Sequence, residues 1–234
     1  EALHAAMSQQ RLDAAGDLAD AQRRLLDAKQ KLRDLRDKHK NSTTISPDAK
    51  MMLGSATSAV AEAEASARTA KECLKRFDNR ESTEDLLDFV AETVTTNALV
   101  VEAVHEVDEC EECINNPNSK ALELRGVRLG KKRNLIGLRQ TKAPTVVAKL
   151  KANLDLLTHM VEGQEPGSAV AKAVNGARKA VQGALLAFEQ FNTKLKEAGD
   201  PVPDAKLAGL AALAARSNML ATVAGSMVEA AALQ

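Results

Sequence analysis

The chain has almost no aromatic residues: it contains four Phe and no Trp or Tyr among 234 residues. A typical globular core takes much more of its volume from aromatic rings, so this core must be built from Leu, Val, Ala and Met packed between helices. Residues that favour strands are also sparse, and most Val and Thr residues recur at helical spacing. The sequence therefore predicts an all-α fold and offers no candidate sheet.

Excess charge and long apolar runs are also lacking. Lys plus Arg and Asp plus Glu both number 32, so the overall charge gives no reason to expect a nucleic acid or an anionic membrane as partner. No uncharged apolar stretch reaches the roughly 18 residues that indicate a membrane-spanning helix. The most apolar segment, 207–233, is interrupted by Arg216 and Glu229. We therefore predict no membrane span within the chain.

What the sequence has instead is a set of long apolar stripes at helical spacing. The clearest lies in 46–77, where apolar residues alternate three and four positions apart: Leu53, Ala56, Val60, Ala63, Ala67, Ala70, Leu74 and Phe77. Such a stripe is typical of a helix that packs along another helix. A second one follows the same rule within 2–39: Ala14, Leu18, Ala21, Leu25, Ala28, Leu32 and Leu35. Alanine at these positions allows two helices to approach closely.

The remaining chain predicts five further helical segments. They are expected over 82–114, over 120–143 with breaks at its glycines and an end at Pro144, over 147–161, over 168–195 and from Asp204 onward. Short polar turns join the seven segments, and short connections make neighbouring helices antiparallel. We expect an elongated antiparallel helical bundle with long Ala/Leu heptad seams. It forms a single domain over 1–234, with 143–145 as the one place where a weak boundary is conceivable.

Two neighbouring segments carry opposite charge. No Lys or Arg occurs from Glu84 to Glu112, whereas 120–142 contains eight basic residues and only one acid, Glu123. An antiparallel return lays the basic segment beside the acidic one, so we predict ion pairs between them, mostly exposed and individually weak. A nucleic-acid site is the other explanation of a basic segment, but no aromatic residue is interleaved to stack on a base. We predict no nucleic-acid partner.

The three cysteines have different expected roles. Cys110 and Cys113 form a Cys-x-x-Cys pair at the end of a helix, where a local disulfide can close in an oxidising compartment. A zinc site would need two further ligands at matching spacing, and a redox motif would need a strand before the helix. A hairpin that turns near Arg80 places Cys73 opposite Leu87 and far from Cys110. We therefore predict that Cys73 is a free thiol beside the seam.

One possible modification site and no catalytic site can be named. Asn41 begins the only Asn-x-Ser/Thr sequon and is a candidate for glycosylation, because it lies in an expected loop. Enzymes built on helical bundles place Glu and His pairs inward three residues apart, whereas the inward positions here are Ala, Val and Leu. We expect no catalytic, metal-binding or cofactor-binding residues, no cofactor and no enzymatic activity.

The alanine-rich seams at 56–70 and 171–184, the scarcity of aromatics and the abundance of Glu, Lys and Ala resemble the helical surface proteins of African trypanosomes. The similarity is greatest to the glutamic acid/alanine-rich proteins of the insect-stage coat, a family related in fold to variant surface glycoproteins and to the haptoglobin–haemoglobin receptor. The resemblance implies an extracellular, non-enzymatic coat protein. Its partners would be neighbouring coat molecules, the membrane through a lipid anchor outside the 234 residues, and an unidentified host factor.

Two other classes share these features. Ala- and Val-rich bundles with few aromatics also look like the rod modules of talin or vinculin, which implies an intracellular cytoskeletal scaffold. Unbridged thiols and an unmodified Asn41 would favour that class. A secreted bacterial translocator or effector bundle is the third possibility. The sequence leaves these alternatives open.

Overall fold

The structure is a computed structural model of the chain, and it describes residues 2–40, 45–116, 119–162, 164–165 and 167–233. Within those ranges the chain forms six α-helices and no strand. The helices are α1 (Ala2–His39), α2 (Pro47–Arg80), α3 (Thr83–Asn115), α4 (Ala121–Val161), α5 (Ala169–Ala198) and α6 (Asp204–Ala232). The predicted all-α bundle is confirmed, with six helices in place of seven.

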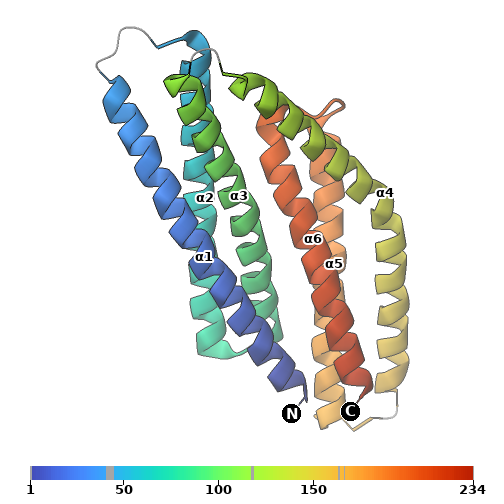
Figure 1. Ribbon diagram of the computed structural model, residues 1–234. Helices are drawn as coiled ribbons and strands as arrows, with labels where there is room; N and C mark the ends of the chain where they lie inside the picture. Colours follow the sequence, from blue (N-terminus) through green and yellow to red (C-terminus); the bar gives the residue numbers. More distant parts are fainter. Residues whose placement is uncertain (1, 41–44, 117–118, 163, 166, 234) are drawn as a thin grey trace.

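The helices pack as two groups of three. Consecutive helices run in opposite directions, with α1, α2 and α3 on one side and α4, α5 and α6 on the other (Figure 1). The closest packing within the groups is between α2 and α3 and between α5 and α6, while α3 and α6 make the main contact between the groups. Both termini lie at the same end of the bundle (Figure 1).

Serine residues cap the N-termini of three helices. Ser46 precedes Pro47 at the start of α2, Ser82 precedes α3 and Ser168 precedes α5. In each case the serine hydroxyl accepts a hydrogen bond of 3.1 Å from the backbone N–H three residues later. This bond satisfies one of the N–H groups that a helix start leaves unpaired, so it fixes where each helix begins.

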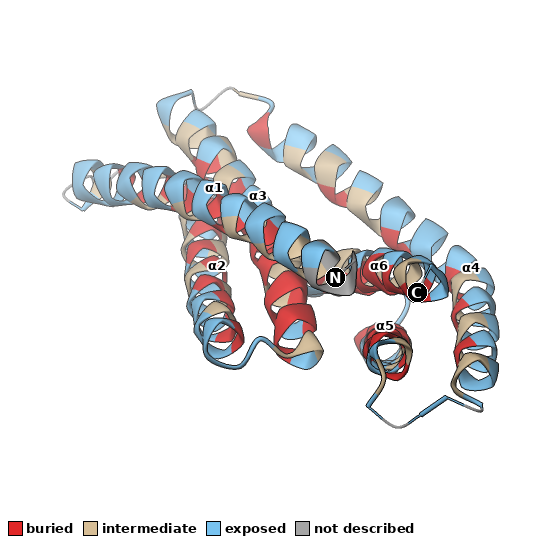
Figure 2. Cartoon of the chain, turned by 90° about the horizontal axis from the view of Figure 1, so that it is seen from below, coloured by how far each residue is buried: buried red, intermediate tan, exposed pale blue. Residues whose placement is uncertain are grey.

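The predicted seams form the core. All seven seam residues of α1 are buried, as are the residues from Ala56 to Ala70 in the α2 seam. Figure 2 shows each helix turning its buried stripe inward and an exposed face outward. Several of the buried residues are alanines with no exposed surface: Ala21, Ala56, Ala63, Ala70, Ala103, Ala177, Ala180, Ala184 and Ala224. Alanine cores bring helix axes close together, so the bundle is slender.

The prediction that a helix ends at Pro144 is wrong, because α4 continues through it to Val161. Five buried residues spaced seven apart run past the proline: Leu129, Ile136, Ala143, Leu150 and Leu157. The continuous apolar stripe holds both halves against α5 and α6, and α4 bends between them (Figure 1). A proline inside a helix typically causes such a bend. Residues 143–145 therefore lie within one helix and do not separate two elements.

Helix α6 is apolar enough to be compared with a membrane span. Its length and mean hydropathy of 1.3 over the most apolar 18 residues meet the criteria for a spanning helix. In the structure it packs against α1, α3, α4 and α5, and Arg216 in its middle forms an ion pair with Glu92 of α3 at 2.6 Å. These contacts are those of a core helix in a helical bundle.

Candidate functional site

The most concentrated polar site lies between α3 and α4. Glu102, Glu106 and Glu109 share one face of α3 because they are four and three residues apart. The first turns of α4 place three cations opposite them: Arg125, Arg128 and Lys132. We call these six residues the α3–α4 ionic cluster. It joins the two oppositely charged segments, so the predicted pairing between them is confirmed.

Arg128 is the centre of the ionic cluster. Its guanidinium donates to Glu102 at 2.7 Å, to Glu106 at 2.6 Å and to both carboxylate oxygens of Glu109 at 2.8 Å. Arg125 donates from Nε to both oxygens of Glu106 at 3.2 Å, and Lys132 pairs with Glu102. Three carboxylates therefore meet three cations in one hydrogen-bonded network.

The ionic cluster is far less exposed than the sequence suggested. The side chains of Glu102 and Glu106 are 8% and 4% exposed, and the other four are each 16% exposed. The expectation of exposed, weak pairs is wrong here. The reason is that α3 packs closely on α1, α2 and α6 but only marginally on α4, so the long charged side chains fill the space between the two helices.

Burial and pairing act on the same groups in opposite directions. Burial raises the pKa of Glu102, but hydrogen bonds from Lys132 and Arg128 lower it by more, so this pKa lies below its usual value. Burial also lowers the pKa of Arg128, whereas its bonds to Glu109 and Glu102 raise it above the ordinary range. Both groups are held in their charged forms, so they join α3 to α4 through ion pairs and are not poised to exchange protons.

The sequence also indicates a candidate glycosylation site, Asn41, and contains three cysteines. Asn41 lies outside the described residues. Cys73, Cys110 and Cys113 are all free thiols in the structure; the first two are buried and the third is partly buried. Burial, with smaller effects from Cys113 and Glu106, raises the pKa of Cys110 to about 11. Burial also raises the pKa of Cys73 and of Cys113. Raised pKa values make thiols poor nucleophiles at neutral pH.

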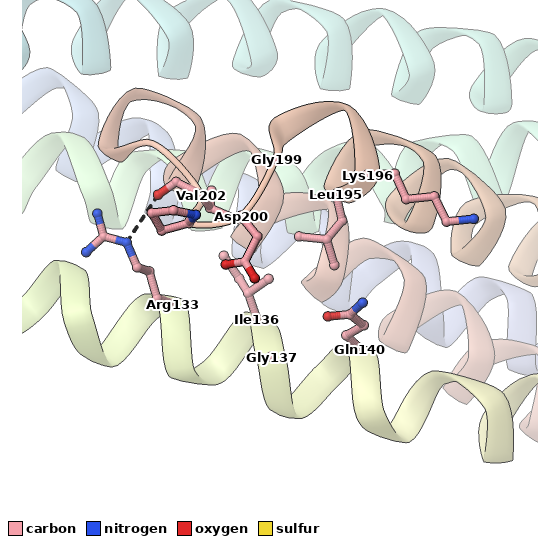
Figure 3. Close-up of a pocket in the computed structure, with 10 residues that line it drawn as sticks. Arg133, Ile136, Gly137, Gln140, Leu195, Lys196, Gly199, Asp200 and Val202 are labelled. Atoms are coloured by element: carbon pink, nitrogen blue, oxygen red, sulfur yellow. Dashed lines mark hydrogen bonds between the residues drawn. The ribbon is translucent and has the colours of Figure 1, made fainter.

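A cavity of about 430 Å³ lies where α4 passes the turn between α5 and α6. Figure 3 shows Arg133, Ile136 and Gln140 of α4 facing the turn, with Leu195 of α5 beside them. The Arg133 guanidinium donates to the backbone carbonyl of Val202 at 3.2 Å and forms an ion pair with Asp204, the first residue of α6. Arg133 therefore holds the α5–α6 turn against α4.

A smaller cavity of about 170 Å³ lies between α1, α3 and α6. Two residues that line it, Gln10 and Thr93, each have a buried oxygen without a hydrogen-bond partner. Thr93 is 1% exposed. Sequence reasoning missed this cavity; the signal in the sequence was Thr93, a polar residue at a helical position that lies among the apolar residues Phe89, Val90 and Val100. Within the described ranges, no three His, Cys, Asp or Glu residues are placed to hold a metal ion.

Comparisons with known proteins add no relative. A scan against protein-family models, a search of curated proteins and a search of solved structures each find no match to the chain.

Proposed function

We propose that the protein is a non-enzymatic cell-surface coat protein that forms a dense layer of slender helical bundles over a plasma membrane. The observation that carries this proposal is the alanine core. Helices α2 and α5 each bury a row of alanines, among them Ala56, Ala63, Ala177 and Ala184, with no exposed surface. Small core side chains reduce the distance between helix axes. A thin rod occupies little membrane area, so many copies fit side by side.

The position of the termini also supports the proposal. Both chain ends lie at one end of the bundle, together with the α2–α3 turn, the end of α4 and the start of α5 (Figure 1). An anchor joined to either terminus would therefore orient the rod in the same direction. The ends of α1, α3 and α5 and the starts of α2, α4 and α6 would then face away from the membrane.

Surface labelling of intact cells tests the proposal. Antibody against the native bundle should label unpermeabilised cells that express the protein, and phosphatidylinositol-specific lipase should release the labelled protein into the medium. Retention of the label after lipase treatment would show that a phosphatidylinositol anchor does not hold the protein on the cell. A signal found only after permeabilisation would refute the coat function altogether.

A second candidate is an intracellular scaffold rod, and one observation favours it. All three cysteines are free thiols, which is the usual state in a reducing compartment. Quantifying thiols in the native protein, with an alkylating reagent under denaturing conditions, separates the two functions when it is combined with surface labelling. Three free thiols in a protein that only permeabilised cells reveal would support the scaffold.

A further inference from the structure

The outward side of α4 carries an unusual row of residues. Two pairs of large apolar side chains, each more than half exposed, are each followed by lysine along it: Leu124, Val127, Lys131, Leu135, Leu138, Lys142 and Lys149. We call these seven residues the α4 outer face. The spacings of three and four residues place the six residues from Leu124 to Lys142 on the side of the helix opposite the buried heptad stripe, and Lys149 continues the row where it also borders the groove between α4 and α6. Isolated exposed apolar residues are ordinary, but a continuous row of them marks an interaction surface.

The charge of the α4 outer face has one sign. No Asp or Glu occurs in α4 from Leu124 to Leu154. The arginines and lysine that point inward are used in the ionic cluster and at the α5–α6 turn. By contrast, Lys131, Lys142 and Lys149 take part in no ion pair within the part of the chain that the structure describes. A partner for this face should therefore combine apolar side chains with carboxylates.

Helix α1 presents such a combination on its own outward side. Four exposed aspartates recur every seven residues, next to two leucines that are 58% and 65% exposed: Asp13, Asp20, Asp27, Asp34, Leu12 and Leu26. We call these six residues the α1 outer face. Seven residues are two helical turns, about 10 Å, so the aspartates form a line along the helix. Asp20 is paired on this face with Arg23, in an exposed contact of little energy.

The two outer faces lie at opposite edges of the molecule. Helix α1 contacts α2, α3 and α6, whereas α4 contacts α3, α5 and α6. Figure 1 shows α4 on the far side of its group and α1 on the side of the other group, where α1 crosses in front of α2 and α3 toward its N-terminus; the two helices run in opposite directions. A face at one edge can therefore reach the complementary face only on another molecule.

We propose that a second copy of this chain docks its α1 outer face on the α4 outer face. Lys142 and Lys149 are seven residues apart, the same repeat as the aspartates, and both faces add exposed leucines. Because the two faces differ, the contact is heterologous and repeats from molecule to molecule, as an open row or a closed ring. The inference deepens the proposed function, on which its biological meaning rests, since lateral contact between copies is what a dense coat requires. An anionic lipid surface would match only the α4 face and would leave the aspartate line of α1 unexplained.

Charge reversal in the full chain tests the contact. One variant carries Lys131→Glu and Lys142→Glu, and the other carries Asp20→Lys and Asp27→Lys. Sedimentation velocity should show the wild type growing beyond a monomer as its concentration rises to on the order of 1 mM, the effective concentration typical of tethered neighbours. Each variant alone should remain a monomer. An equimolar mixture should associate again, because each variant keeps one original face and their reversed faces also complement each other.

A matched control keeps the comparison specific. Lys50→Glu with Lys75→Glu reverses two exposed cations on α2 and should associate like the wild type, and circular dichroism should confirm that every variant is folded. Monomeric wild type throughout, unaffected association of either variant, or failure of the mixture to associate would each overturn the proposal. If the wild type stays monomeric but floats with phosphatidylserine vesicles, and this flotation requires Lys131 and Lys142, the α4 outer face binds lipid instead. Surface labelling of a protein that never self-associates would retain the coat function and reject this contact.

Discussion

Replacing Arg128 by methionine removes the one side chain that contacts all three glutamates of the ionic cluster. Methionine keeps much of the length and apolar volume of arginine but donates no hydrogen bond. After the change Glu102 keeps Lys132 and Glu106 keeps Arg125. Glu109 has no ion pair other than that with Arg128 in the described part of the chain, so its carboxylate is left alone.

The expected loss follows from burial. Removing one partner of a buried ion pair costs about 3–5 kcal/mol, because the remaining charge stays out of water without compensation. Two of the three glutamates keep a cation, and Glu109 is partly exposed and can turn toward solvent. We therefore expect the lower end, about 3 kcal/mol of unfolding free energy. For a chain of this size, that corresponds to a decrease in Tm of about 6–12 °C.

Urea unfolding followed by circular dichroism measures this loss, and its pH dependence identifies the cause. The folded pKa of Glu102 is lowered, so its stabilising contribution is present above the unfolded pKa of about 4.3 and is lost as pH falls through the folded value. In the variant, Glu102 loses its hydrogen bond from Arg128, so its pKa should be higher than in the wild type. The stabilisation that Arg128 provides through Glu102 is lost as Glu102 is protonated, so the difference between the two proteins should shrink as pH falls from 7 to 4.

Lys194→Met is the matched control, because Lys194 pairs with Glu197 in an exposed contact on α5. That variant should differ from the wild type by no more than about 0.5 kcal/mol. The reasoning is refuted if Arg128→Met costs less than about 1 kcal/mol at pH 7, or if its cost is the same at pH 4 as at pH 7.

Three further predictions test the core and the thiols. Ala63→Phe should destabilise the fold by about 1–3 kcal/mol or more, since Ala63 has no exposed surface, whereas Ala61→Phe on the exposed side of α2 should be nearly neutral in the same urea titration. Thr93→Val should stabilise the fold by about 1 kcal/mol, because it removes a buried hydroxyl that has no hydrogen-bond partner. Thr96→Val should destabilise the fold by about 1 kcal/mol, because it breaks a hydrogen bond of 2.8 Å. Equal effects of the two substitutions on the free energy of unfolding would contradict both predictions. With the other two cysteines replaced by Ala, Cys110 should react with a disulfide reagent at pH 8 at least about tenfold more slowly than the same variant unfolded in urea, since burial raises its pKa and shields the thiol.

Much of the fold could be predicted from the sequence because a helix repeats every 3.6 residues, and apolar residues at that period identify its buried side. The α1 seam from Ala14 to Leu35 needed no other information. The predicted end at Pro144 is wrong, because the local effect of proline on a helix is weaker here than the packing of the heptad from Leu129 to Leu157. That heptad was visible in the sequence, and it shows that packing along the whole stripe outweighs one lost backbone hydrogen bond.

The ionic cluster could be predicted only in part. The opposite charges of 84–112 and 120–142 indicated the pairing, but burial depends on how far apart the two helices lie. That distance is set by where α3 meets α1, α2 and α6, which no pattern within the two segments records. The cavity lined by Gln10 and Thr93 depends on three helices at once, so no spacing within a single helix could reveal it.

The proline inside α4 has a consequence for how the molecule opens. Pro144 has no N–H, so the backbone carbonyl of Gln140 receives no hydrogen bond from the position where a helix would normally supply one. Gln140 is exposed and borders the cavity near the α5–α6 turn, where solvent can take that place. A continuous helix normally loosens first at its ends. In α4, amide hydrogen exchange should begin at the middle as well as at the ends, so that the two halves of the helix exchange as separate units.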